Sequence, residues 1–519
     1  DALPILERMY VELVRASGTF EVNDRSVGRL AVVLAVFALQ GANPVPDVNE
    51  QNYLGKAIHY WNPHWAKGDF FLETPDAHLV FYLSFGWLSL LVSPPVMAWA
   101  GRLLVWTLLA WSWQRLSSAV LPVRWWSILT AALLACLVDR CHVAGEWIIG
   151  GVEAKGFAFV LMFLSLEAIL RNRWGRAWLL LGGATMFHPL VGGWSAVAAA
   201  IVWLWDRAHS PSLRQMLPAM LGGLVIALPG LVPVLLLNRG ADAATASQAN
   251  VIYVFYRLYH HLDPLSFQPP FVVRFVLLGL LWLALCELLR AEADLRRLRL
   301  FVAAAISIAI VGAAAALIQF VDRPLAAAVL RFYWFRLADI AVPLGVALVG
   351  PCAVRRIAQE HPGRAAGWLT IVICLLSIHF VPLACQRIQP GAPRADRLPD
   401  YHAWRDVCDW IAANDQIPSD AIWLTPRANQ TFKWYTGRPE VVTWKELPQN
   451  AAGICQWWER LGDIYGYDSA PGKLLHSLLS SVPPEQLLAA ARKYNASFLL
   501  ADRKSDLPLK RLYANRSYA

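Results

Sequence analysis

The sequence predicts a mostly α-helical membrane protein, in which a polytopic bundle of about 11 transmembrane helices precedes a small α/β domain outside the membrane. Hydrophobic residues make up 57% of the 519 residues and charged residues only 16%, whereas soluble domains carry roughly 25% charged residues. Apolar runs near the roughly 20 residues that span a bilayer recur as far as residue 385. Beyond that point charged residues become frequent and the apolar runs become short.

Eleven apolar segments fit transmembrane helices, and together they place the bundle at 27–385. They are 27–42, 95–114, 125–138, 153–170, 177–189, 191–205, 216–237, 271–289, 300–320, 334–354 and 366–385. The apolar segment 78–93 runs into Pro94 and Pro95, and we expect it to form a helix in the outer membrane interface. Residues 177–205 allow two interpretations, either two short spans that turn at His188-Pro189 or one long span.

The arginines predict the orientation of the bundle. They are concentrated in one set of alternate loops, and cytoplasmic loops are the ones enriched in Lys and Arg. We therefore expect a cytoplasmic segment at 1–26 and an outer acidic loop at 43–94, in the inner (plasma) membrane of a bacterium. Because the net charge of +9 is spread over many loops and forms no basic face, the sequence excludes a nucleic-acid-binding protein.

The chain after the last predicted span has the pattern of a small periplasmic or extracellular domain. A Pro-rich linker at 386–400 leads into an extramembrane α/β domain at 401–519. Apolar periodicity predicts helices and short strands in alternation, which is typical of α/β domains. The helices are expected at 401–414, 451–461 and 485–494, and the strands at 421–424, 440–443 and 497–501.

Asp47 and Glu50 are the first candidates for a catalytic site, because they lie three residues apart just after the first predicted span. Two close carboxylates raise the pKa of one of them, which favours a general base, or they bind a divalent cation such as Mg or Mn through oxygen. The alternative is that Asp47 caps a helical turn and both carboxylates are solvated.

Two further candidates lie where predicted spans meet the outer side. Glu153 and Lys155 are two residues apart at the start of a span, where two charged side chains do not both face lipid. They could line a polar cavity, with Lys155 contacting a phosphate, or form a local ion pair. His188 precedes Pro189, which leaves a backbone carbonyl without its helical partner, and the alternative there is an ordinary helix end.

The remaining candidates are basic residues among aromatic ones. Arg257 and His260 alternate with tyrosines in the outer loop 238–270, a composition that suits a sugar phosphate or an interfacial aromatic belt. Arg331 and Arg336 enter a span from outside, where Arg336 could pair with Asp339 and leave Arg331 for an anionic ligand. Arginines that reach the lipid head groups are the alternative.

The layout resembles the GT-C superfamily of integral-membrane glycosyltransferases. The resemblance is carried by Asp47-Val-Asn49-Glu50 after the first span, by Gly68-Asp69, by the Pro-containing end of 78–95 and by Arg102. It implies a polyprenyl-phosphate sugar as donor and an unknown acceptor, with Asp47 as general base, supported by Glu50, or as a cation ligand. Lys155, Arg257 and Arg331 would then hold the lipid phosphate. The acids stand three residues apart, wider than in many motifs of the superfamily, which puts a metal requirement in doubt.

A second resemblance is to an uncharacterised bacterial membrane family, a domain of unknown function. It is carried by 423–426, 429–438 and 442–445 in the tail, and by 153–157, 187–192 and 331–336 in the membrane part. That family implies no activity. Two other functions therefore stay open beside the transferase: a non-catalytic membrane assembly or binding protein, and a transporter of a lipid-linked substrate, although the inverted repeats usual in transporters are not visible.

Overall fold

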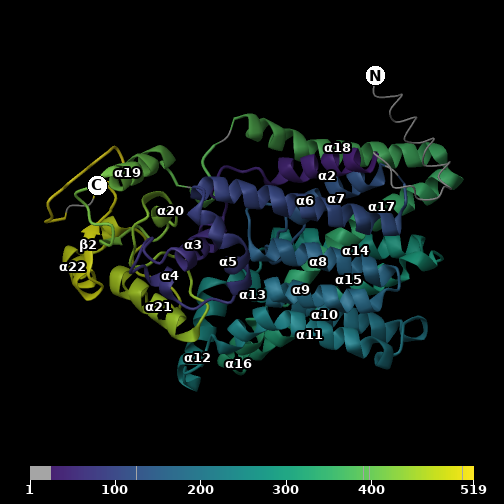
Figure 1. Cartoon of the computed structure of the whole chain (residues 1–519), viewed down its shortest axis with the longest axis horizontal. Coiled ribbons are helices and arrows are strands. Elements are labelled where there is room, and N and C mark those ends of the chain that lie inside the picture. Colours follow the sequence, from purple (N-terminus) through teal and green to yellow (C-terminus); the bar gives the residue numbers. More distant parts are fainter. Residues whose placement is uncertain (1–24, 124, 390, 397, 505–506) are drawn as a thin grey trace.

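The computed structural model describes residues 25–123, 125–389, 391–396, 398–504 and 507–519. Long helices run side by side along the length of the molecule, and a smaller C-terminal part lies at one end of them (Figure 1). Most of the segment expected to be cytoplasmic, 1–26, lies outside the described residues.

Each of the 11 predicted spans coincides with a helix. These helices are α2 (Arg25–Gly41), α6 (Pro94–Val120), α7 (Trp126–Arg140), α8 (Ala154–Leu170), α9 (Trp174–Phe187), α10 (Pro189–Trp205), α11 (Leu213–Leu236), α14 (Pro269–Leu288), α15 (Arg296–Ala316), α17 (Arg336–Glu360) and α18 (Pro362–Ile388). Among the described residues, five helices are long and apolar enough to cross a membrane, and shorter apolar helices accompany them. The protein is therefore a helical membrane protein, and the full count of spans stays a prediction.

The chain reverses direction at His188, so that residues 177–205 form two helices, as in the first of the two interpretations. Pro189 occupies the first turn of α10, and the His188 side chain accepts a hydrogen bond from the Val191 backbone nitrogen at 3.3 Å. Far from this turn, Arg297 bonds both Asp206, which follows α10, and the Ile169 carbonyl near the end of α8, at 3.0 and 3.1 Å. The ends of α8 and α10 thus lie together, away from His188.

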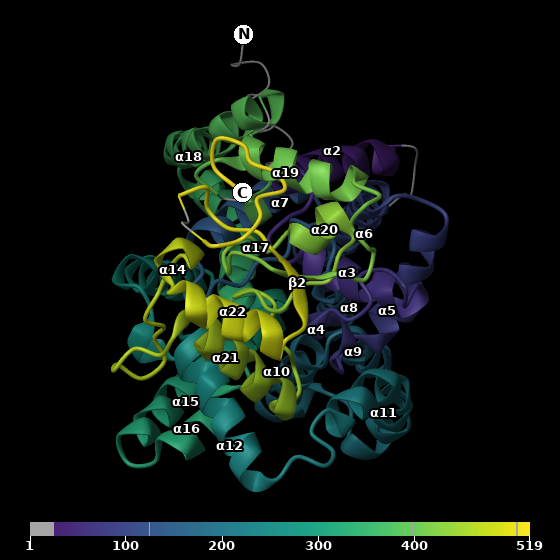
Figure 2. The ribbon, with the colours of Figure 1, turned by 90° about the vertical axis from the view of Figure 1, so that its left-hand side faces the viewer.

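The bundle has two different ends. The domain end faces the C-terminal part, and α19 to α22 lie across it when the molecule is viewed from that side (Figure 2). Short elements fill the connections there: α3 (Glu50–Trp61), α4 (Phe70–Glu73), α5 (Leu79–Phe85), η1 (Gly86–Leu90), α12 (Ala243–Val251), η3 (Ile252–Arg257), α13 (Tyr259–Leu262), η4 (Pro264–Ser266), η6 (Leu317–Phe320) and α16 (Arg323–Leu330). The segment 78–93, expected in the interface, is the short pair α5 and η1. At the opposite end, the described residues contain two short elements, η2 (Arg207–His209) and η5 (Ala293–Leu295).

The C-terminal region is small and mostly helical, with two parallel strands. It contains α19 (Tyr401–Ala413), β1 (Ile422–Leu424), α20 (Phe432–Thr436), α21 (Ala451–Tyr465), η8 (Leu479–Ser481), α22 (Pro484–Lys493) and β2 (Ala496–Leu499). Trp423 pairs with Phe498 in the parallel register, and their rings stack at 4.8 Å. The strand predicted at 440–443 was wrong in extent: only Glu440 forms a bridge, to Trp423.

The segment predicted as a linker, 386–400, is packed against both parts. It contains η7 (Arg394–Asp396), in which Asp396 is fully buried and accepts hydrogen bonds from the hydroxyls of Thr431 and Tyr435. A buried carboxylate needs such donors because desolvation is costly. The sequence signal of a Pro-rich stretch did not indicate these contacts.

Helices α9 and α11 approach so closely that glycine is required where they cross. A Cβ atom on Gly182 would lie 2.1 Å from the Gly223 carbonyl oxygen, and one on Gly223 would lie 2.5 Å from the Trp178 carbonyl oxygen. Small residues at such crossings allow helix backbones to touch within a membrane.

We expect Gly223→Ala to lower the thermal stability of the detergent-solubilised protein, because its methyl group meets backbone and forces the helices apart at a cost of about 1–3 kcal/mol. Gly279→Ala on α14 is the matched control, since no atom lies within 4 Å of its Cβ position. The control should be neutral or stabilising by up to about 1 kcal/mol from helix propensity. Equal melting temperatures for the two variants would contradict the close crossing.

Candidate functional site

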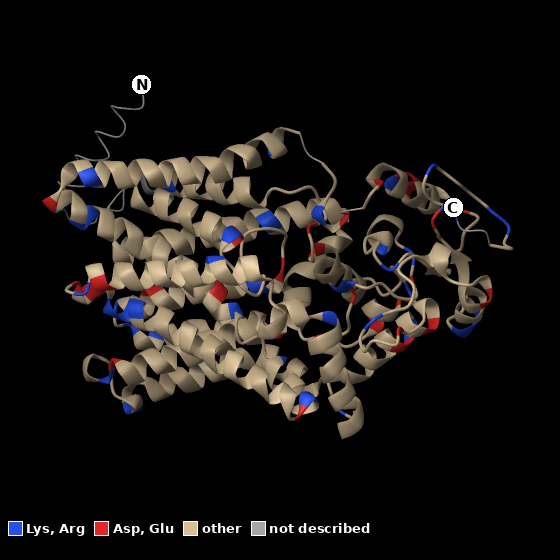
Figure 3. Ribbon diagram, turned by 180° about the vertical axis from the view of Figure 1, so that it is seen from behind, with Lys and Arg blue, Asp and Glu red and all other residues tan. Residues whose placement is uncertain are grey.

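A cavity of about 430 Å³ lies where the domain end of the bundle meets the outer loop and the C-terminal region. Charged positions gather at this junction and at the opposite end, whereas the helices between them are mostly uncharged (Figure 3). The polar residues that line the cavity are Asn49, Asn52, Tyr53, Asp76, His78, Tyr82, Glu146, Glu153, Lys155, His188, Tyr253, Arg257, His260, His261, Tyr333, Arg336, Arg394, Lys445 and Gln449. We call this space the main cavity.

The lining of the main cavity is positively charged. It has five Lys or Arg side chains and three carboxylates, which leaves a formal charge of +2 when the histidines are neutral. Burial lowers the pKa of His78 and His261, and desolvation together with the positive charges of Arg257 and Lys445 lowers the pKa of His260, a more exposed side chain, to about 4. The cavity is therefore suited to an anion.

One group of cations in the main cavity already has a carboxylate partner. Glu146, in the connection after α7, forms ion pairs with Lys155 at 2.8 Å and with Arg336 at 2.5 Å, which joins the starts of α8 and α17. Arg336 also contacts Nε2 of His188 at 3.2 Å. The pairing of Arg336 with Asp339 that the sequence suggested is replaced by this contact.

Asp339 holds the connection after α7 by hydrogen bonds to its backbone. Its carboxylate accepts hydrogen bonds from the backbone nitrogens of Val143, Ala144 and Glu146 at 2.7, 2.9 and 3.1 Å. These three bonds fix the connection that carries Glu146 against the start of α17. Asp339 therefore positions Glu146 without contacting the cavity itself.

A second group of cations has no carboxylate partner. Arg257 and Lys445 line the same part of the main cavity, and neither forms an ion pair with a carboxylate in the described parts of the chain. Arg257 donates from Nε to the Trp444 carbonyl at 2.8 Å, which places it beside Lys445. Burial, together with the positive charge of Arg257, lowers the pKa of Lys445 to about 8. These two side chains are available to bind an anion.

Glu153 is the cavity carboxylate with the character of a base. It lies just before α8, and its Oε2 atom is 3.5 Å from Lys155, whereas its buried Oε1 atom has no hydrogen-bond partner among the described residues. Burial raises the pKa of Glu153 above its ordinary value, against the opposing effect of Lys155. A carboxylate with a raised pKa is a stronger base than an ordinary glutamate, and its oxygen without a hydrogen bond can accept a proton.

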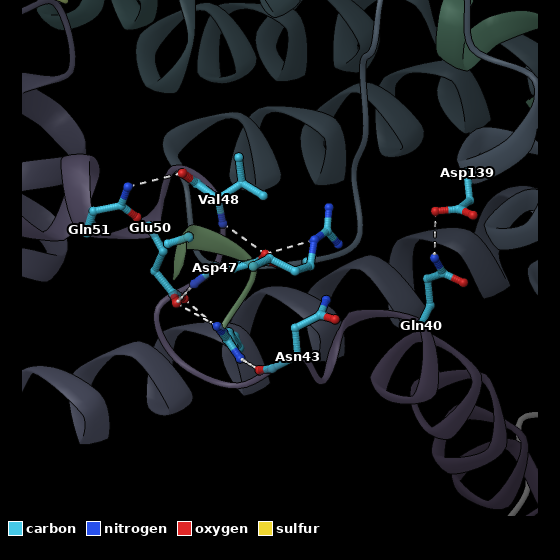
Figure 4. Close-up of polar contacts among 12 residues, drawn as sticks. Gln40, Asn43, Asp47, Val48, Glu50, Gln51 and Asp139 are labelled. Atoms are coloured by element: carbon cyan, nitrogen blue, oxygen red, sulfur yellow. Dashed lines mark hydrogen bonds and ion pairs between the residues drawn. The ribbon is translucent and has the colours of Figure 1, made fainter. Parts of the chain in front are cut away.

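Asp47 and Glu50 are fully buried but do not line the main cavity. Their partners are drawn in Figure 4. Glu50 pairs with Arg102 at 2.6 Å and accepts from the Val152 backbone nitrogen at 3.0 Å. Asp47 accepts from the Gly151 nitrogen at 3.0 Å and pairs with Arg394 at 3.2 Å. Both carboxylates thereby tie the outer loop to the segment that precedes Glu153.

These contacts do not fit a divalent cation. Arg102 and Arg394 already balance the charges of Glu50 and Asp47, which a cation would otherwise neutralise. No group of three or more His, Cys, Asp or Glu side chains is placed to hold a metal ion within the described residues. The catalytic role predicted for the two acids is not tested by this geometry.

Six of the nine residues singled out in the sequence line the main cavity. They are Glu153, Lys155, His188, Arg257, His260 and Arg336. Arg331 lies outside the lining, where its Nη1 atom donates to Asn250 at 2.6 Å. The candidates had not included four charged residues of the lining, namely Asp76, Glu146, Arg394 and Lys445. Glu146 could have been found from its place before the charged start of a span, whereas Arg394 gave no signal.

A buried charge cluster holds the C-terminal region on the outer loop. Lys433 of α20 pairs with Asp69 at 3.2 Å, with Glu440 at 3.0 Å and with Glu446, and all four side chains are buried. Asp69 belongs to the outer loop, so the cluster joins two parts of the chain. Burial raises the pKa of Glu446 to about 8 and that of Glu440 above its ordinary value. We call these four residues the Lys433 cluster.

Comparisons with known proteins show similarity to a protein family and to solved structures. Residues 402–464, which include α20 and Lys445, match a family described as a domain of unknown function (DUF6798), as the tail motifs predicted. The chain is also similar to the crystal structure of the Archaeoglobus fulgidus oligosaccharyltransferase in complex with Zn and sulfate. That similarity has 12% identity and a TM-score of 0.41, and it covers 91% of this chain and 67% of the other. No curated protein matches the chain.

The Lys433 cluster predicts how docking depends on pH. In the docked state Glu446 keeps its proton up to about pH 8, whereas an exposed glutamate loses it near 4.5. Between about pH 4.5 and pH 8, Glu446 is protonated when the C-terminal region is docked and ionised when it is not. Docking therefore requires uptake of a proton, and it should weaken as the pH rises through this range. Glu440 acts in the same direction, while Lys433, whose pKa is raised, stays charged throughout. Lys56 and Arg460, two charged side chains near the cluster, add positive charge.

We expect Glu446→Gln to reduce this decline, because the amide resembles the protonated acid and cannot ionise. Melting temperatures measured between pH 5 and pH 8 by tryptophan fluorescence test this, with the exposed Glu485→Gln as control. A decline in Glu446→Gln as steep as in the wild type would show that Glu446 is ionised in the docked state.

Proposed function

We propose that this protein is a membrane glycosyltransferase, which moves a sugar from a polyprenyl-phosphate donor to an acceptor on the outer side of the membrane. The main cavity carries the proposal, because it combines a net positive lining with a basic carboxylate at the end of an apolar bundle. The resemblance of the sequence to the GT-C superfamily supports it. In this proposal the domain end faces the periplasm or the cell exterior, as the arginine distribution predicts.

The donor phosphate would bind Arg257 and Lys445. Arg257 is buried and Lys445 is half-buried, neither has a carboxylate partner among the described residues, and a desolvated phosphate requires charged donors. His260 lies beside them and can donate a hydrogen bond while neutral. Lys155, which the sequence indicated as a phosphate ligand, is paired with Glu146 and would contribute less.

An apolar groove gives the lipid chain of the donor a place beside the main cavity. The groove has a volume of about 270 Å³ and is lined by Pro189, Leu190, Gly193, Trp194, Val197, Phe332 and Trp334. Its residues are direct neighbours of cavity residues in the chain, since Pro189 follows His188 and Tyr333 lies between Phe332 and Trp334. A ligand with an anionic head and an apolar tail could therefore occupy both spaces.

Glu153 is the base in this proposal. Its carboxylate accepts the proton of the acceptor hydroxyl as that oxygen bonds to the anomeric carbon of the sugar. The bond from this carbon to the phosphate oxygen breaks, and the lipid phosphate leaves with the electron pair. Arg257 and Lys445 meet the negative charge that develops on the phosphate. Asp47, the base suggested by the sequence, holds the segment before Glu153.

We expect the purified protein to release polyprenyl phosphate from at least one member of a panel of polyprenyl-phosphate sugars. Glu153→Gln should lower the turnover about 10²- to 10⁴-fold, the usual contribution of a general base. Asp47→Asn should lower it less if Asp47 only positions the loop, and more if Asp47 is the base. Glu485→Gln is the control. Donor binding without turnover in the folded wild type would favour a binding protein or a transporter.

Lys445 predicts a pH dependence of donor binding. Since its pKa is about 8, the ammonium loses its charge as the pH rises above that value, and a phosphodiester donor analogue, whose charge is constant, should bind more weakly. Lys445→Arg should keep the affinity unchanged from pH 7 to pH 9, whereas Lys445→Gln should bind about tenfold more weakly at pH 7. The exposed Lys473→Gln is the control, and calorimetry measures the affinity. Identical pH profiles for the wild type and Lys445→Arg would exclude Lys445 from the site.

A further inference from the structure

A second, smaller pocket adjoins the main cavity. It has a volume of about 200 Å³ and lies between the domain ends of α2 and α7. Its lining includes Gln40, Asp139, His142, Glu146, Trp147 and Arg394. Asp139 has 42% of its side chain exposed, so that solvent reaches the pocket from the outside. We call this space the side pocket.

The two spaces share a wall. Gly145, Glu146, Trp147 and Arg394 line both of them. A transferase needs two binding spaces that touch, because the acceptor oxygen must reach the carbon that leaves the donor. The shared wall carries Glu146, which is tied to Lys155 beside Glu153. A ligand in the side pocket would therefore meet the main cavity close to the proposed base.

The polar groups of the side pocket can both donate and accept hydrogen bonds. Gln40 donates to Asp139 at 3.2 Å (Figure 4). Its carbonyl oxygen contacts His379 Nε2 at 2.8 Å, which fixes the amide. His142 stacks on Phe271 at 4.8 Å, and its buried Nδ1 atom has no hydrogen-bond partner among the described residues. Burial lowers the pKa of His142, so the ring is neutral at pH 7.

The charge of the side pocket differs from that of the main cavity. It has two carboxylates, Asp139 and Glu146, and one cation, Arg394. Asp139 also pairs with Arg140 at 3.4 Å, so the side pocket has no cation free of a carboxylate partner among the described residues, in contrast to Arg257 and Lys445 of the main cavity. The remaining lining is apolar or aromatic, with the Trp147 indole on the shared wall. Amide, carboxylate and imidazole groups beside an indole are suited to the hydroxyls and the apolar face of a sugar ring.

We propose that the side pocket binds the acceptor, and that this acceptor presents an uncharged sugar ring with free hydroxyl groups. Asp139, Gln40 and His142 hold the hydroxyls, and the ring lies against the wall that carries Trp147. That the bound sugar is an acceptor rests on the proposed transferase function. The sugar-binding site itself can be tested without turnover.

The test is saturation-transfer NMR on the detergent-solubilised full chain with methyl glucoside, methyl galactoside and methyl mannoside as probes. At least one should bind, and glucose 6-phosphate should bind more weakly because of the two carboxylates. Asp139→Leu and His142→Phe should each weaken binding at least fivefold, and the second variant keeps the stacking on Phe271. The exposed residues Asp415 and His402 supply the matched controls Asp415→Leu and His402→Phe.

The outcomes separate this inference from the proposed function. Binding that both pocket variants leave unchanged, or a folded wild type that binds no glycoside, overturns the side-pocket assignment. If Asp139→Leu does not fold, His142→Phe alone decides. A titration of the same sample with polyprenyl phosphate tests the main cavity: its failure, with glycoside binding retained, overturns the transferase and leaves a sugar-binding site.

Discussion

The buried ion pair between Glu50 and Arg102 is the interaction on which the arrangement of the site depends. Both side chains are fully buried, and removing one partner of such a pair typically costs about 3–5 kcal/mol because the other charge stays uncompensated. The pair joins α3 to α6, and Glu50 also accepts from the Val152 backbone nitrogen. It therefore determines where α8 begins, and with it the positions of Glu153 and Lys155. A charge pair inside the protein thus organises the charges that face the cavity.

The C-terminal region covers the main cavity and also contributes residues to its lining. Glu446 of the Lys433 cluster is the direct neighbour of Lys445, so the contact that docks this region also delivers a cation to the main cavity. Phe70 of the outer loop packs among residues of α21, including Trp457, and extends the same interface with apolar contacts. Docking and ligand binding are consequently linked through two adjacent residues. The stretch that matches a domain of unknown function contains both of them.

The sequence predicted the helices well because length and hydrophobicity are local properties, and every expected span is a helix. Lys155, His188 and Arg336 could be assigned to one site because each lies at the same end of a predicted span. Asp47 shows where this reasoning stops, since the sequence cannot distinguish a solvated carboxylate from one enclosed by backbone nitrogens and Arg394. Lys445 is brought into the cavity by contacts between distant parts of the chain, which no local pattern records.

The distribution of charge gives a physical reason for the cavity to hold a ligand. No carboxylate of the described residues forms an ion pair with Arg257 or Lys445, and burial together with the positive charge of Arg257 lowers the pKa of Lys445. Keeping Arg257 and Lys445 both charged in the main cavity costs free energy. A bound phosphate would offset this cost because its negative charge balances the two cations. The opposite arrangement holds at the shared wall, where Glu146 forms ion pairs with Lys155 and Arg336 and Glu153 also lies 3.5 Å from Lys155. The main cavity thus has one part in which the cations have carboxylate partners and one part, with Arg257 and Lys445, whose charge an anion would balance. The proposed base, Glu153, lies between these two parts.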